Sequence, residues 1–272
     1  MAMPDRDNPA SSWPAGVPPL VEEAPLPGGM VCDTRRGRLA DGREVVVKRS
    51  PYPADAEVDG LRALAAAGVP VPDVVGFADR VLVLGYVCGK PDWPELGRAV
   101  ARMHRTTGPA YGWRRDNRAG RFVQENGWLD DWPTFYAERR VRAHLADPRI
   151  PDDLRRRLER ACDGPLPALL PRTPTPSLTH GDLWVGNIVD GRWLIDPEVS
   201  YADRELDLAY MHMSRSLPSE FYAAYEREWP YQPGYARRRP ALQLHHVLLQ
   251  IRHFEPARYR PALEAVLGYY GW

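Results

Sequence analysis

Residues 180–187 combine side chains that could transfer a phosphoryl group. The segment reads His-Gly-Asp-Leu-Trp-Val-Gly-Asn, and Ile-Asp-Pro-Glu follows at 195–198. A carboxylate such as Asp182 can orient a substrate hydroxyl and accept its proton, while Asn187 and Asp196 offer the hard oxygen ligands that Mg²⁺ prefers on nucleotide phosphates. Positioning and charge neutralisation supply most of the catalysis in such reactions. The pattern therefore predicts Asp182 as the catalytic base and Asn187 and Asp196 as metal ligands.

Lysine is rare in this chain, because Lys48 is one of only two lysines among 36 basic residues. It ends a run of three valines typical of a strand, and a lysine on a strand can bind the α- and β-phosphates of a nucleotide while a glutamate on a helix holds it. Glu57, on a helix predicted over 54–67, is the candidate partner. Gly28 and Gly29 could let a hairpin close over the phosphates. Together these residues predict a nucleotide site.

Three further polar residues are expected to brace the central motif. His180 is interpreted mainly as a hydrogen-bonding support for the loop that carries the catalytic base. Glu205 and Asp207 are expected to pin the following helix to that loop.

The pattern of apolar residues predicts two lobes. Residues 21–49 are typical of β-hairpins, and 71–77 and 81–87 of two further strands, so the first lobe is a small, mostly antiparallel sheet with one helix. The rest is mainly helical, with helices predicted at 96–106, 132–145, 152–170, 203–213, 219–229, 240–253 and 261–269. We expect an α+β fold with a nucleotide-binding lobe at 1–87, of which about the first 20 residues are loose, and a catalytic lobe at 88–272.

Composition narrows the class of protein. The formal net charge is 0, whereas nucleic-acid-binding domains are usually strongly basic. No window approaches 18 apolar residues, so no membrane span is predicted. The three cysteines, Cys32, Cys88 and Cys162, have neither zinc-site spacing nor a disulfide pattern. We therefore expect a cytoplasmic protein, either a monomer or a homodimer, with no nucleic-acid or membrane partner.

The order Lys48, Glu57, Asp182, Asn187 and Asp196 resembles the protein-kinase-like fold. The finer pattern resembles the fructosamine kinase (ketosamine 3-kinase) family, in which His-Gly-Asp-Leu-Trp-x-Gly-Asn is characteristic. The resemblance runs from about residue 20 to 254 and is most specific in the second lobe. The other matching segments are 111–117, 124–126, 131–139, 205–209 and 221–238.

This resemblance implies a kinase that uses ATP and Mg²⁺ to phosphorylate the sugar 3-hydroxyl of a ketosamine, the rearranged adduct of a reducing sugar and an amine. In the family the 3-phosphate destabilises the adduct and frees the amine, so the implied role is deglycation. The substrate would be a fructosamine or ribulosamine on a small amine or a protein lysine. Adenine would be held at the end of the last strand of the first lobe, by Leu84, Tyr86 and Val87.

Five residues are candidates for contact with the acceptor. They are Trp184, His180, Trp113, Asp116 and Gln124. Core packing is an equal alternative for Trp184, and fixing a loop by hydrogen bonds is an equal alternative for Trp113, Asp116 and Gln124.

Two other functions are consistent with parts of the pattern. The first is a kinase of the same fold that acts on an aminoglycoside, a choline-like alcohol or another sugar; Trp184 and the segment 131–136 argue against it. The second is a pseudokinase that binds nucleotide without turnover, and the complete set of residues from Lys48 to Asp196 argues against that.

Overall fold

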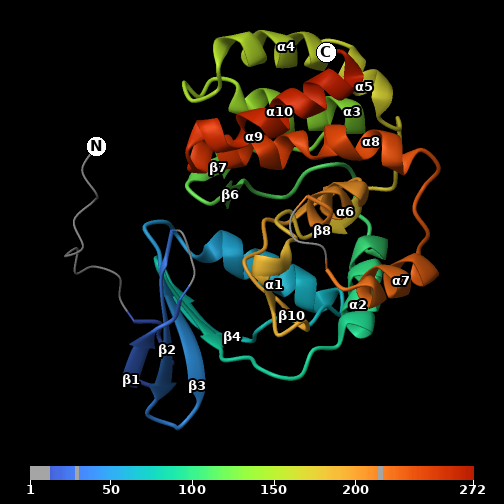
Figure 1. Ribbon diagram of the computed structural model, residues 1–272. Coiled ribbons are helices and arrows are strands. Elements are labelled where there is room, and N and C mark those ends of the chain that lie inside the picture. Colours follow the sequence, from blue (N-terminus) through green and yellow to red (C-terminus); the bar gives the residue numbers. More distant parts are fainter. Residues whose placement is uncertain (1–12, 28–30, 214–216) are drawn as a thin grey trace.

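A computed structural model describes residues 13–27, 31–213 and 217–272. The chain begins with a five-stranded antiparallel sheet and continues into a larger, mainly helical part (Figure 1). The strands are β1 (Leu20–Pro25), β2 (Asp33–Leu39), β3 (Glu44–Arg49), β4 (Val74–Ala78) and β5 (Val81–Gly85), in the spatial order β1-β2-β3-β5-β4. Helix α1 (Asp55–Ala66) connects β3 to β4. This is the arrangement expected for the first lobe.

The alternation of side chains along β3 decides where its lysine points. Val45 and Val47 are fully buried in a small cluster on one face of the sheet. Successive residues of a strand point to opposite faces, so Val46 and Lys48 lie on the other face. There Val46 packs against the core that also contains residues of α1.

The second part of the chain holds nine α-helices and three strand pairs among the described residues. Its helices are α2 (Trp93–Arg105), α3 (Trp132–Phe135), α4 (Asp152–Cys162), α5 (Pro165–Leu169), α6 (Glu205–Met211), α7 (Ser219–Glu228), α8 (Tyr235–Leu242), α9 (Leu244–His253) and α10 (Pro256–Tyr270). Its strands form three antiparallel pairs: β6 (Asn117–Ala119) with β7 (Phe122–Gln124), β8 (Ser177–Thr179) with β11 (Ser200–Ala202), and β9 (Ile188–Val189) with β10 (Trp193–Leu194).

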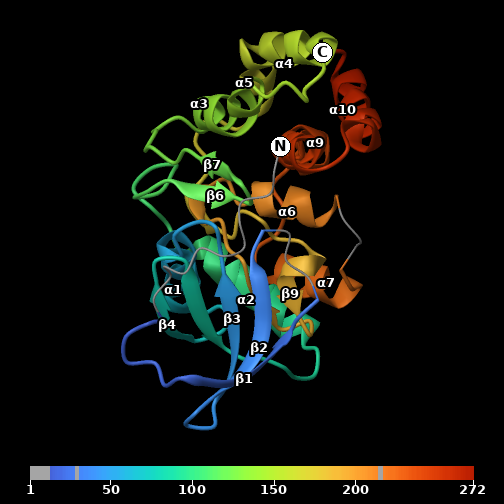
Figure 2. The same cartoon turned by 90° about the vertical axis from the view of Figure 1, so that its left-hand side faces the viewer.

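Figure 2, turned by 90°, shows α3, α4, α5, α9 and α10 gathered at the end of the molecule away from the sheet. The hairpin β9–β10 and helices α1, α2 and α6 lie between the two ends. The segment 180–198, which contains this hairpin, thus lies where the sheet and the helical part meet.

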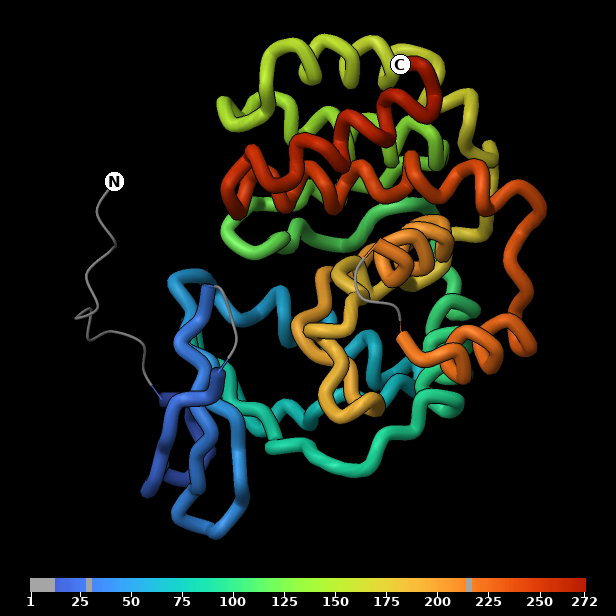
Figure 3. The backbone as a smooth tube through the Cα atoms, viewed as in Figure 1, coloured from blue at the N-terminus to red at the C-terminus, as the bar shows by residue number. Residues whose placement is uncertain are grey.

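One hydrophobic core crosses from the first part of the chain into the second. It includes Val58 and Leu61 of α1 and Leu84 of β5, together with Leu183 and Leu194 of the segment 180–198. A separate core holds the distal helices. Figure 3 shows the chain leaving the sheet after β5 along one extended segment that leads to α2. The lobe boundary at 87/88 stays a prediction.

Several helix boundaries differ from those predicted. The helix expected over 152–170 is two helices, because Gly164 and Pro165 interrupt it between α4 and α5. The helix expected over 132–145 continues from α3 as a π-helical turn (Tyr136–Val141) and a 3₁₀ turn (Arg142–His144). The helix expected over 240–253 is α8 and α9, which meet at Gln243. Within the described residues, no helix is both long and apolar enough to cross a membrane.

Candidate active site

Lys48 joins the sheet, α1 and the segment that follows the hairpin β9–β10. Its Nζ lies 2.5 Å from Oε1 of Glu57 and 2.6 Å from Oδ1 of Asp196. The lysine side chain is 10% exposed, so both ion pairs are largely shielded from water. Burial lowers the pKa of Lys48, but the charges of Glu57 and Asp196 outweigh it and raise this pKa above its ordinary value. The ammonium group therefore stays charged.

The proposed catalytic loop, residues 180–187, follows β8 and turns sharply at Gly181. This residue has φ +85°, and a Cβ atom there would lie 2.3 Å from the main-chain oxygen of Glu198. Only glycine fits such a turn without strain. Beyond it, the side-chain amide of Asn187 donates to the main-chain oxygen of Asp182 at 2.8 Å and to its Oδ2 at 2.6 Å. The loop thus folds back so that Asp182 and Asn187 are in direct contact.

The hairpin β9–β10 brings Asp196 to the same place. Its base is closed by a hydrogen bond from the main-chain N–H of Ile195 to the oxygen of Asn187 at 3.1 Å. Leu194 also donates to the main-chain oxygen of Pro70, which fixes the hairpin to the first part of the chain. Asp196 itself has φ +55°, a left-handed conformation that aspartate tolerates better than most residues.

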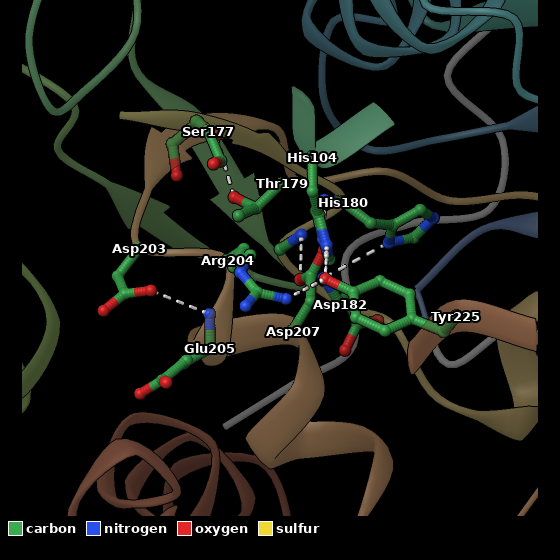
Figure 4. Close-up of polar contacts among 12 residues, drawn as sticks. His104, Ser177, Thr179, His180, Asp182, Asp203, Arg204, Glu205, Asp207 and Tyr225 are labelled. Atoms are coloured by element: carbon green, nitrogen blue, oxygen red, sulfur yellow. Dashed lines mark hydrogen bonds and ion pairs between the residues drawn. The ribbon is translucent and has the colours of Figure 1, made fainter. Parts of the chain in front are cut away.

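Asp207 of α6 holds the start of the catalytic loop (Figure 4). Its carboxylate accepts the main-chain N–H groups of His180 at 2.7 Å and Gly181 at 3.0 Å. His104 of α2 lies 3.2 Å from the same carboxylate and 2.8 Å from the hydroxyl of Tyr225. These hydrogen bonds lower the pKa of Asp207 even though burial acts to raise it. The bracing role expected for Asp207 is present.

Glu205 braces a different contact. It is fully buried and binds Arg238 of α8 through two hydrogen bonds, at 2.7 and 2.8 Å. A paired, bidentate geometry of this kind is what a buried carboxylate requires. Glu205 therefore pins α6 to α8 rather than to the catalytic loop.

Burial gives Asp182 the protonation behaviour of a base near neutrality. Desolvation raises its pKa to about 7, the hydrogen bond from Asn187 lowers it, and the charge of Asp196 adds to the increase. A general base is most effective when its pKa lies near the working pH. Glu198 is a second partly buried carboxyl group beside it, and desolvation together with the charge of Asp182 raises the pKa of Glu198 well above its usual range.

Two side chains have the donor atoms that Mg²⁺ requires. The amide nitrogen of Asn187 is used by Asp182, which leaves its oxygen as an acceptor. Asp196 binds Lys48 through Oδ1, and its side chain is 41% exposed. Magnesium commonly takes one or two protein oxygens and completes its shell with phosphate and water. Asn187 and Asp196 therefore fit such an ion.

His180 and Trp184 lie in different surroundings although they share the loop. His180 is fully buried, donates from Nε2 to the oxygen of Ile195 at 3.0 Å and accepts at Nδ1 from the N–H of Asp182. It is placed to brace the loop and not to touch an acceptor. Trp184 is 36% exposed, and its ring packs against Gly186, where a Cβ atom would lie 2.4 Å from the indole. It is the exposed aromatic residue of the loop.

The other three acceptor candidates hold loops together in this structure. Trp113 is buried, and its indole N–H donates to Asp59 of α1 at 2.8 Å. Asp116 accepts the main-chain N–H of Asn126 at 2.9 Å. Gln124 is buried and donates to Oδ1 of Asn117 at 3.0 Å. For these residues, the hydrogen-bonding alternative matches the observed contacts.

Three of the remaining nucleotide-site candidates lie at the end of β5 or directly after it. Leu84 is buried on β5 opposite Val46, on the same face as Lys48. Tyr86 follows β5, and its main-chain N–H donates to the main-chain oxygen of Glu44. The guanidinium group of Arg36 lies over its ring. Val87 is half-buried. Gly28 and Gly29 lie outside the described residues.

Three residues of the site were not predicted from the sequence. His104 supports Asp207, His246 of α9 donates to the main-chain oxygen of Gly181 at 3.0 Å, and Glu198 lies beside Asp182. The two histidines come from distant helices and belong to no local pattern. Glu198 directly follows Ile-Asp-Pro, so its place in the motif was the available signal.

The comparisons with known proteins agree with one another. The fructosamine kinase family model matches residues 27–268. A probable ketoamine kinase of Synechocystis is 37% identical over 216 residues, which cover 71% of this chain and 70% of that protein. A probable ketoamine kinase of Enterococcus faecium is 34% identical over 213 residues, covering 74% and 76%.

Solved structures extend the likeness to the fold. A candidate fructosamine-3-kinase from Thermobifida fusca has a TM-score of 0.84 and 30% identity over 92% of this chain and 93% of that one. A macrolide 2′-phosphotransferase from Brachybacterium faecium, at 20% identity and a TM-score of 0.56, shares the fold. The bilobal, protein-kinase-like α+β fold expected from the sequence is thus confirmed. The chain belongs to the fructosamine kinase family, and it is a phosphotransferase that acts on a hydroxyl group.

Proposed function

We propose that this protein transfers the γ-phosphoryl group of ATP to the 3-hydroxyl of a ketosamine, and that the phosphorylated adduct then breaks down to release its amine. The observation that carries the proposal is the contact between Asp182 and Asn187, at 2.6 Å, beside the Lys48–Asp196 ion pair, also at 2.6 Å. A base, an oxygen donor for a metal and a phosphate-binding cation are the parts that phosphoryl transfer requires.

Asp182 acts on the acceptor hydroxyl. As the hydroxyl oxygen forms its bond to the γ-phosphorus, the bond from that phosphorus to the β–γ bridging oxygen breaks and ADP leaves. The hydroxyl proton passes to the Asp182 carboxylate. With a pKa raised to about 7 by burial, this carboxylate is a better proton acceptor than an exposed aspartate.

Lys48 and Glu57 orient the donor. The ammonium group of Lys48 is charged, shielded and held by Glu57, so it can bind the α- and β-phosphates without a large loss of side-chain entropy. Asn187 and Asp196 would hold Mg²⁺. When bound, this ion neutralises the charge of the phosphates. Leu84, Tyr86 and Val87 are proposed to contact the adenine.

The acceptor is proposed to be a sugar-amine adduct because the relatives are named ketoamine kinases. Trp184, exposed on the catalytic loop, offers an apolar wall for the sugar or for the carrier of its amine. Fructosamine and ribulosamine adducts, on a small amine or a protein lysine, are the proposed substrates. The use of ATP as the phosphoryl donor favours a cytoplasmic location.

The test measures ADP release with Mg·ATP and each of three acceptors: ribulose-lysine, fructose-lysine and kanamycin. We expect turnover on at least one ketosamine and its loss in the Asp182→Asn variant. Turnover on kanamycin alone would preserve the phosphotransfer mechanism and contradict the proposed acceptor. Turnover unaffected by the substitution would contradict the role of Asp182.

A further inference from the structure

Helix α1 presents different residues to two sides of the molecule. Glu57 reaches Lys48, and Gly60 packs against Pro197, where a Cβ atom would lie 3.0 Å from the proline ring. Asp55 and Asp59 are four residues apart and so share another side of the helix. Figures 1 and 2 both show α1 next to the β6–β7 region, and α1 contacts β6.

Asp59 makes the less exposed of the contacts by which α1 binds the segment before β6. Its Oδ2 accepts the indole N–H of Trp113 at 2.8 Å and Nε of Arg114 at 3.1 Å. The Asp59 side chain is 12% exposed and Trp113 is 6% exposed. Hydrogen bonds to a charged, shielded carboxylate are stronger than those on an open surface.

Trp113 is itself fixed to other segments of the second part of the chain. Its main-chain N–H donates to Asn126 at 2.8 Å, and the preceding residue, Gly112, exchanges two hydrogen bonds with Tyr201 of β11, at 2.9 and 2.7 Å. The rings of Trp113 and Tyr201 are 5.2 Å apart between centroids. Strand β11 follows Asp196 closely in the chain. Trp113 therefore connects α1 to the strand that comes after the hairpin β9–β10.

We propose that the Asp59–Trp113 hydrogen bond is an interlobe latch that holds α1, and with it Glu57, in the position that orients Lys48 toward the nucleotide. Asp59 and Trp113 are positioning residues, since neither touches Lys48. Without the latch, α1 can move away from the segment that follows the hairpin β9–β10, and Lys48 loses one of its two carboxylate partners. This inference rests on the proposed use of ATP and deepens it.

The test compares four single variants of this contact and its surroundings, and it adds Glu57→Gln alone and combined with Trp113→Phe. Trp113→Phe keeps the ring but removes the donor, and Asp59→Ala removes the acceptor. Asp59→Asn retains an oxygen that can accept from the indole. Asp55→Asn is the matched control, because Asp55 is on the same side of α1 and pairs with Arg115 at 2.6 Å, but both side chains are well exposed. The readouts are the Kd for Mg·AMP-PNP by calorimetry, KM for ATP and kcat, at a temperature where thermal unfolding shows each variant to be folded.

We expect Trp113→Phe and Asp59→Ala to raise the Kd for Mg·AMP-PNP by about tenfold, which corresponds to about 1.4 kcal/mol. Asp59→Asn should recover most of the affinity, and Asp55→Asn should match the wild type. Trp113→Phe should add little to a Glu57→Gln variant, because both act on the same contact. Wild-type affinity in Trp113→Phe and Asp59→Ala, or full additivity with Glu57→Gln, would overturn the latch.

These outcomes separate the latch from the proposed acceptor, because AMP-PNP binding is measured without any acceptor. A wild-type chain that binds Mg·AMP-PNP but phosphorylates no ketosamine would contradict the acceptor assignment and leave the latch result standing. A wild-type chain that binds no nucleotide would overturn both.

Discussion

The side-chain amide of Asn187 donates to the carboxylate of Asp182 at 2.6 Å, so the proposed base is held by the residue proposed to bind the metal. Replacing Asp182 by Asn removes the proton acceptor while preserving its size. We expect kcat to fall by about 10²–10⁴, the usual contribution of general base catalysis. Steady-state kinetics with a ketosamine would measure the change, and a thermal midpoint near that of the wild type would exclude unfolding as its cause.

Replacing Lys48 by Met should impair the nucleotide site. The substitution removes a buried cation and leaves the carboxylates of Glu57 and Asp196 without it. We expect kcat/KM for ATP to fall by about 10²–10³, as for other losses of preorganised charge stabilisation. Arg49→Met is the matched control, since Arg49 is the next residue of β3 and pairs with Glu23 at an exposed position. Equal losses in both variants would argue against a specific role for Lys48.

The sequence predicted the parts of the site that local patterns encode. Alternation along β3 places Lys48 on the opposite face of the sheet from two buried valines. The motif places Asp182 and Asn187 on one loop. The hydrogen bonds that connect elements distant in the sequence were not predictable in this way. His104 and Asp207 are separated by 103 residues, and His246 and Gly181 by 65. No spacing rule relates such positions, since the fold alone brings them together.

The ends of the helices show a second limit of what could be predicted from the sequence. Apolar spacing continues through 152–170, but the chain breaks at Gly164 and Pro165, whose effect on a helix was visible in the sequence. The contact between Trp113 and Asp59 was not visible, because the sequence was equally consistent with Trp113 lining a substrate pocket and with Trp113 fixing a loop by hydrogen bonds.

Replacing Asp207 by Asn should loosen the catalytic loop. The carboxylate accepts two main-chain N–H groups, from His180 and Gly181, and an amide can satisfy them less well because half of its polar atoms are donors. We expect the free energy of unfolding to fall by about 1.5–3 kcal/mol, the range for hydrogen bonds to charged groups. Urea unfolding would measure it, and kcat should fall as well. Unchanged stability would show that the loop does not depend on this carboxylate.

The buried Glu205–Arg238 pair should contribute far more to stability than an exposed pair. Glu205→Gln leaves the Arg238 guanidinium without its carboxylate, and breaking one partner of a buried pair typically costs about 3–5 kcal/mol. Asp163→Asn removes an exposed partner of Arg142 and should cost less than about 1 kcal/mol. Urea unfolding of both variants tests the contrast. Similar losses would mean that burial does not determine the contribution of these pairs.

His144 should make the protein less stable in acid. Burial, and then the positive charge of Arg252, lowers the pKa of His144 to about 3 from an ordinary value of 6.5. In the unfolded chain, His144 therefore binds a proton below about pH 6.5, whereas in the folded chain it binds one only below about pH 3. The free energy of unfolding therefore falls as the pH falls across that window. Between pH 7.5 and 5.5, this one group should lower the free energy of unfolding by about 1.4 kcal/mol.

The comparison must be made against a His144→Gln variant, because other groups titrate in the same range. Burial raises the pKa of Asp182 and of Asp203 to about 7, and a carboxyl group with a raised pKa stabilises the fold as the pH falls. These contributions are common to both proteins and cancel in the difference. Urea unfolding at pH 7.5, 6.5 and 5.5 should show the wild type losing about 1.4 kcal/mol relative to the variant. A difference that does not change with pH would mean that His144 can take up its proton without opening the fold.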